Sequence, residues 1–214
     1  MTTYYDASPI TITRCQKHEE HKDHLIGLID EFKSTHQTLY KPHLHSDWHL
    51  PNSQVSERPY LSYFYSIIEP VMESIGDSLG LKFFDWHIHN GWFQQYTEGC
   101  NHPWHNHPGC HFTNAYYLEL PDEKYKTEIM GLDGESIEYT AKEGDVMTCG
   151  AWMQHRSPIH GPGRKTVISF NSDFRLHLDY EGNRNLSGHV QTHGGETNII
   201  SDAGMSGHIQ TYEN

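Results

Sequence analysis

The sequence predicts a mainly β fold, a barrel or jelly roll with helices packed on its outside. Apolar residues recur at helical spacing in the first 80 residues, and from Lys82 onward they alternate with period two. Many short strand-like runs separated by turn signals then follow, which is typical of antiparallel barrels and sandwiches. We expect three parts: strand and helices over 1–80, a β core over 81–178, and a polar C-terminal arm or tail over 179–214.

The first 80 residues contain one short strand and two helices. Residues 8–14 (SPITITR) alternate as a strand does, and a helix is expected from about 18 to 35, where Leu25, Leu28, Ile29 and Phe32 share one face. Residues 40–58 form a polar loop. A second helix, kinked at Pro70 and ending at Gly80, carries apolar residues at Leu61, Phe64, Ile68, Met72, Ile75 and Leu79.

The β core begins with a long alternating strand. One face is expected to carry Phe84, Trp86, Ile88, Asn90, Trp92, Gln94 and Tyr96, and the opposite face Asp85, His87 and His89. Further strands are expected at 112–120, 127–130, 136–140, 145–149 and 165–174. The turn signals between them are LPDE, LDGE, KEGD and HGPG.

Charge and composition exclude several classes of protein. Fifteen Lys and Arg against 28 Asp and Glu give a net charge of −13 without a basic stripe, which argues against binding to duplex nucleic acid. The sequence has no apolar run long enough to span a membrane and no signal-peptide core, so we expect no membrane association. Its four cysteines contain no CxxC pair and are expected to be reduced thiols in a cytoplasmic protein.

The C-terminal segment contains a near-repeat. LSGHVQT at 186–192 recurs as MSGHIQT at 205–211. Two copies are too few for a solenoid. We interpret them as related edge strands, or as an arm that pairs with another subunit in a homo-oligomer.

Histidine is abundant, with 19 residues in the chain, so an isolated HxH pair carries little information. One constellation is more specific: His105 and His107 are followed by His155 and then by the basic pair Arg164-Lys165. On one strand, His105 and His107 would point to the same face about 6.7 Å apart at Cα. Three neutral nitrogen ligands leave metal positions open for a substrate and O₂, and a basic residue can hold a substrate carboxylate.

The segment 92–118 resembles the 2-oxoglutarate- and iron(II)-dependent oxygenases, with the sequence WFQQYTEGCNHPWHNHPGCHFTNAYYL. GDV at 144–146, the region around His155 and ISFN at 168–171 extend the resemblance. It is greatest to a poorly characterised subgroup from marine bacteria and their phages. The resemblance implies a cupin-like double-stranded β-helix that binds Fe(II) and 2-oxoglutarate. The implied reaction uses O₂ to hydroxylate a small-molecule or peptide substrate and releases succinate and CO₂.

The resemblance assigns His105 and His155 to the metal and places His107 where many relatives have Asp or Glu. His111 is an alternative ligand, because 107–111 is similar to the opening of a cupin motif. The resemblance also implies that the basic residue that binds 2-oxoglutarate lies six positions before the Asn of SFN, which is Lys165 here, on the same face as Ser169. Arg164 is the alternative, because its planar guanidinium can form two parallel hydrogen bonds to a carboxylate. Only one of Tyr116 and Tyr117 can enter the barrel and donate to 2-oxoglutarate. The expected pocket wall is formed by Asn101, Trp92, Gln94 and Trp152.

Two other functions are also compatible with the sequence. One is a cupin-type metal dioxygenase that needs no 2-oxoglutarate, and the other is a non-enzymatic jelly roll used for binding or assembly. The basic residue after His155 distinguishes the first alternative, because such a dioxygenase has no use for it. The sequence does not identify the substrate.

Overall fold

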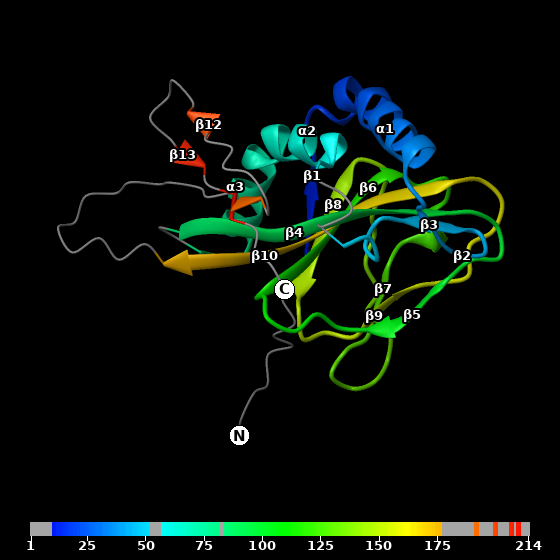
Figure 1. Ribbon diagram of the computed structural model, residues 1–214. Coiled ribbons are helices and arrows are strands. Elements are labelled where there is room, and N and C mark those ends of the chain that lie inside the picture. Colours follow the sequence, from blue (N-terminus) through cyan, green and yellow to red (C-terminus); the bar gives the residue numbers. More distant parts are fainter. Residues whose placement is uncertain are drawn as a thin grey trace.

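The computed structural model describes residues 10–51, 57–81 and 84–176, together with four two-residue strands beyond them. Three layers are visible in Figure 1: helices, a large sheet, and a small sheet on the far side. Most of the polar arm expected over 179–214, and with it the proposed pairing between subunits, lies outside the described residues. Among the residues described, no helix is both long and apolar enough to cross a bilayer.

The large sheet has seven antiparallel strands in the order β1-β8-β6-β10-β4-β3-β2. Their bounds are β1 Ile10–Arg14, β8 Asp145–Gly150, β6 Phe112–Glu119, β10 Lys165–Leu176, β4 Phe84–Tyr96, β3 Leu44–Ser46 and β2 Leu39–Lys41. The small sheet has the order β5-β9-β7, formed by His102–His105, His155–Ser157 and Glu128–Ile129. The remaining short strands are β11 Gln191–Thr192, β12 Ile199–Ile200, β13 Ser206–Gly207 and β14 Ile209–Gln210. A 3₁₀ turn, η1, spans Glu123–Tyr125.

Three helices cover one face of the large sheet: α1 His18–Thr35, α2 Pro59–Ile67 and α3 Glu69–Ser78. The expected helix 18–35 is confirmed. The second expected helix is divided into α2 and α3 at Ile68, because Pro70 supplies no N–H and its ring collides with the preceding turn. Gly80 adopts φ +69°, and the Leu81 N–H bonds back to the Gly76 carbonyl, which ends α3 as expected.

Burial on both faces of the large sheet explains why its strands are so apolar. In β6, Tyr116 and Leu118 pack against the helices, whereas Ala115 and Tyr117 face the small sheet. Both sets are almost completely buried. A strand covered on both faces reads as a continuous apolar run rather than an alternating one.

The expectation that alternate residues of 84–96 all share one face is wrong, because the strand contains a β-bulge. Asn90 pairs with Asn171 but Ile88 pairs with Ser172, so His89 is an extra residue in β4. Ile88 therefore packs with the helices, like Trp86 before it. Beyond the bulge the faces exchange: Trp92, Gln94 and Tyr96 point between the two sheets, and Phe93 joins the helix-side core.

Two other expectations are corrected. The polar loop 40–58 contains the β2–β3 hairpin, whose turn places His43 at φ +66°. The expected strand 136–140 does not form, and an isolated bridge between Met130 and Ser136 takes its place. Its neighbour β7 is two residues long and offers too short an edge for a further ladder.

Candidate metal centre and adjoining pocket

A pocket lies between the large and small sheets. Its walls are the inward side chains of β4, β6, β8 and β10 on one side and of β5 and β9 on the other. The chain carries a net charge of −13, yet no carboxylate of the described residues lines this pocket. The pocket is therefore suited to an anionic ligand.

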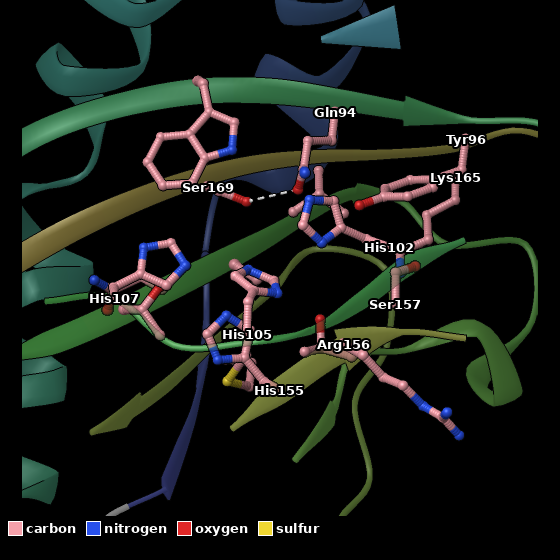
Figure 2. A pocket seen from close by; sticks show the side chains of 17 residues that line it. Gln94, Tyr96, His102, His105, His107, His155, Arg156, Ser157, Lys165 and Ser169 are labelled. Carbon is pink, nitrogen blue, oxygen red and sulfur yellow. Dashed lines mark hydrogen bonds between the residues drawn. The ribbon is translucent and has the colours of Figure 1, made fainter. Parts of the chain in front are cut away.

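Three histidines converge at one end of the pocket (Figure 2). His105, His107 and His155 each offer one ring nitrogen, and these three atoms lie within 4.8 Å of one another. The ring centroids of His105 and His155 are 4.3 Å apart, and each is 5.1 Å from that of His107. Among the described residues, this is the one group of His, Cys, Asp or Glu side chains close enough to hold a metal ion together.

Strand pairing brings two of these histidines together from positions 50 residues apart. His105 ends β5 and pairs directly with His155, which begins β9. The expectation that His105 and His107 share a strand is wrong, because β5 ends at His105. His107 lies in the following loop, where its N–H donates to the Ala151 carbonyl at 2.9 Å and its ring stacks on Trp92.

Hydrogen bonds determine which ring nitrogen of His105 and of His155 is available to bind a metal. His105 Nδ1 lies 2.9 Å from the Pro103 carbonyl oxygen, and His155 Nδ1 lies 3.1 Å from that of Met153. A carbonyl oxygen can only accept, so each Nδ1 carries the proton and each Nε2 keeps its lone pair. Backbone acceptors of this kind are typical partners of metal-binding histidines.

Burial keeps the centre uncharged at neutral pH. Burial, and after it the neighbouring imidazoles, lowers the pKa of His155 to about 3 and that of His107 to about 4. The pKa of His105 is also lowered by burial. All three rings are therefore neutral and ready to donate to a metal. The donor set, three imidazoles without a carboxylate, fits Fe(II) and also other divalent transition metals.

Lys165 lies at the other end of the pocket and is almost completely buried. Its ammonium donates to the Tyr125 carbonyl at 2.6 Å and to Ser157 Oγ at 3.0 Å, and it lies 4.9 Å from the centre of the Tyr96 ring. Burial lowers its pKa to about 7, although Cys100 and Glu128 act in the opposite direction. An ammonium has three donors, so one N–H remains for a ligand in the pocket.

The structure places Arg164 on the opposite face of β10 from Lys165. Its guanidinium forms two hydrogen bonds to Glu119, at 2.7 and 2.8 Å, and approaches Asp30 at 3.5 Å. Thr166 shares this outer face and also binds Glu119. Arg164 is therefore occupied outside the pocket, whereas Lys165 points into it.

The two tyrosines also point in opposite directions, as expected. Tyr116 faces the helices and its hydroxyl contacts His18 Nδ1 at 2.7 Å, which places it outside the pocket. Tyr117 is inside the barrel, but its hydroxyl accepts from the Thr127 N–H and lies 3.2 Å from the Tyr139 hydroxyl. Neither tyrosine lines the pocket.

The other candidate residues are divided between the pocket and the surface. Trp92, Gln94 and Ser169 line the pocket wall, where Ser169 donates to Gln94 Oε1 at 3.3 Å. Asn101 is exposed and Trp152 is 57% exposed, and neither lines the pocket. His111 lies outside the histidine group, because its N–H and ring are directed at Asp173.

Sequence reasoning missed ten of the residues that line the pocket, among them Tyr96, His102 and Ser157. His102 lies beside the metal centre, with its ring 4.3 Å from that of His105. Ser157 follows His155 by two residues and therefore shares its face, a signal that the sequence contained. Tyr96 alternates with Trp92 and Gln94 along the sequence, which is the signal that places it beside them in the pocket.

No family model and no curated protein sequence matches the chain. Several solved structures match the chain in fold. A prolyl-4-hydroxylase from Pseudomonas putida is 10% identical, with 80% of this chain and 94% of that chain covered and a TM-score of 0.53. HygX from Streptomyces hygroscopicus, solved with nickel and 2-oxoglutarate bound, is 8% identical over 88% and 89% of the chains, with a TM-score of 0.57.

The epimerase SnoN from nogalamycin biosynthesis, described as non-heme and α-ketoglutarate-dependent, is 10% identical and covers 78% of each chain, with a TM-score of 0.58. At such low identity these likenesses establish the fold. Together with the two facing antiparallel sheets, they confirm the predicted jelly roll. The chain therefore has the double-stranded β-helix fold of the 2-oxoglutarate- and iron(II)-dependent oxygenases.

Proposed function

We propose that this protein is a non-haem iron oxygenase that uses 2-oxoglutarate and O₂ to hydroxylate a small-molecule or peptide substrate, releasing succinate and CO₂. One observation carries the proposal. A three-histidine centre and a buried lysine lie at opposite ends of one pocket, and none of the described residues that line it is a carboxylate. A dianion with one end on a metal and the other on an ammonium matches this charge arrangement.

Each end of the pocket has a distinct role in this proposal. His105, His107 and His155 hold the metal, and Lys165 binds the distal carboxylate of 2-oxoglutarate. When bound, Fe(II) and 2-oxoglutarate supply the activation of O₂ that hydroxylation requires. HygX carries nickel and 2-oxoglutarate on the same fold, which supports the assignment.

The remaining wall residues orient the ligand and exclude water. The Lys165 ammonium lies over the Tyr96 ring and donates a hydrogen bond to Ser157 Oγ. These two contacts fix the position of the charge that would bind the distal carboxylate. Gln94 and Ser169 form a polar pair on the wall between the two ends. Trp92 covers one face of His107. A low-dielectric wall strengthens the attraction between the lysine and a carboxylate.

The first alternative, a dioxygenase that needs no 2-oxoglutarate, is favoured by the donor set of three histidines. Anaerobic titration of the Fe(II)-loaded protein with 2-oxoglutarate separates the two. The proposal expects a weak visible charge-transfer band that saturates with one equivalent of 2-oxoglutarate. If Fe(II) binds stoichiometrically and neither a band nor heat of binding is seen, the proposal is wrong and the alternative is favoured.

Several finer predictions accompany this function. The greater resemblance to oxygenases of marine bacteria and phages, a cytoplasmic location, and the division at residues 80 and 178 all rest on the sequence. The absence of nucleic-acid and membrane binding, and a homo-oligomer formed through the C-terminal arm, rest on it too. Sedimentation of the full chain beside a chain shortened at residue 178 would test the last of these.

A further inference from the structure

The three metal-centre histidines differ in the partner of the outward nitrogen, which is the ring nitrogen that does not face the metal position. For His105 and His155, Nδ1 donates to a backbone carbonyl two residues earlier in the chain. His107 lies in a loop rather than at a strand end, and its backbone N–H is used by Ala151. Its ring therefore requires an acceptor from another part of the fold if it is to be held as firmly as the other two.

Asn171 stands where such an acceptor is needed. It lies on β10, and strand alternation gives it the same face as Lys165, Val167 and Ser169, which all line the pocket. It does not itself line the pocket, and its side chain is 8% exposed. The residue that pairs with it on β6 is Thr113, a pocket residue. Asn171 is thus buried immediately behind the wall of the pocket.

The amide oxygen of Asn171 is an unused acceptor. Among the described residues, Oδ1 is buried and makes no hydrogen bond of acceptable geometry. The His107 ring stacks on Trp92, and Trp92 pairs across β4 and β10 with Ser169. Asn171 is the next residue of β10 on the face of Ser169, so the amide and the ring belong to the same part of the wall. An orphaned buried acceptor costs stability, and its presence in a fold calls for an explanation.

We propose that Asn171 is a positioning residue, whose Oδ1 accepts a hydrogen bond from the outward ring nitrogen of His107 and holds this imidazole in its metal-binding orientation. The inference rests on the proposed metal centre and adds to it the partner of its third ligand. Asn171 would do for His107 what the carbonyls of Pro103 and Met153 do for the other two histidines. The bond would also set the tautomer of His107, so that its other nitrogen keeps a lone pair for the metal.

The test is anaerobic titration with Co(II) in competition with a chromophoric chelator, with the visible Co(II) bands as a second readout. Asn171→Ala should bind Co(II) about 10- to 100-fold more weakly than the wild-type protein, the usual effect of losing such a partner. Asn171→Asp keeps an acceptor and should bind no more weakly than wild type. Asn90→Ala removes an exposed asparagine directly across the strand pair and should leave the affinity unchanged.

Two further measurements separate positioning from a general structural role. In a His107→Ala background, Asn171→Ala should cause no additional loss of affinity, because the side chain acts through that ring. The metal-free Asn171→Ala protein should still melt in a single cooperative transition, so that its lower affinity for Co(II) is not caused by a loss of fold.

Three outcomes would overturn the inference while leaving the metal centre intact. These are wild-type affinity in Asn171→Ala, a loss in Asn171→Asp equal to that in Asn171→Ala, or an undiminished effect of Asn171→Ala when His107 is already absent. If the wild-type protein itself fails to bind Co(II), the proposed function is overturned and the inference falls with it.

Discussion

Removal of the Lys165 ammonium should weaken 2-oxoglutarate binding and abolish its dependence on pH. The ammonium is buried at the end of the pocket, where two of its three donors are already used by Tyr125 and Ser157. A hydrogen bond to a charged partner contributes about 1.5–3 kcal/mol. Lys165→Met should therefore reduce the affinity roughly 10- to 100-fold.

The pH dependence follows from the direction of the pKa shift. Burial lowers the pKa of Lys165 to about 7, so the side chain is charged below this pH and neutral above it. If the charged form alone binds the distal carboxylate, the apparent dissociation constant rises as the protonated fraction falls. With this pKa, the affinity should be roughly 25-fold weaker at pH 8.5 than at pH 6.5. The loss accompanies rising pH because the lysine gives up its proton.

Isothermal titration calorimetry on the metal-loaded protein would measure this effect. Near pH 8, binding should take up close to one proton, which is detected by comparing buffers of different ionisation enthalpy. Lys165→Met should show weak affinity that does not vary over this range, because the 2-oxoglutarate carboxylates remain ionised throughout. A wild-type affinity that is flat between pH 6.5 and 8.5, without proton uptake, would refute the assignment of Lys165.

Three other perturbations have distinct expected results. His105→Ala and His155→Ala should each lose stoichiometric Co(II) binding. The control His43→Asn should retain it, because asparagine tolerates the φ of +66° at that turn. Unaltered binding in either alanine variant would contradict the ligand assignment. Arg164→Ala should lower the free energy of unfolding by about 1 kcal/mol, because its ion pairs are partly exposed, and should leave 2-oxoglutarate affinity unchanged; a large loss of affinity would contradict its outward placement. Asp47→Ala should lower the free energy of unfolding, measured by urea denaturation, by about 3–5 kcal/mol. The reason is that this buried carboxylate accepts hydrogen bonds from the Arg58 and Tyr60 side chains and from a backbone N–H of β4. A loss below about 1 kcal/mol would show that these donors find other partners.

The local pattern of the sequence predicted what depends on near neighbours in the chain. The helix at 18–35 follows from apolar residues at helical spacing, and the end of α3 follows from a glycine that tolerates positive φ. The strands β6, β8 and β10 follow from apolar runs between turns. The spacing of His105, His107 and His155 predicted three histidines that the fold does bring together.

The site itself depends on features that local patterns do not record. One extra residue at His89 exchanges the two faces of β4, and so decides that Trp92 reaches the pocket while Ile88 does not. The end of β5 at His105 leaves His107 in a loop. Such irregularities are set by pairing with strands distant in sequence, which an alternation count along one strand cannot detect.

The sequence by itself therefore determined the fold class, the order of most elements and which three histidines come together. Only the tertiary structure decided that Lys165 faces the pocket while Arg164 binds Glu119, and that the Tyr117 hydroxyl is already engaged by Thr127. It alone placed Asn171 behind the pocket wall. Side-chain types and spacings are properties of the chain, but which face is inside, and which polar groups are already satisfied, are fixed when two sheets close on each other and exclude water.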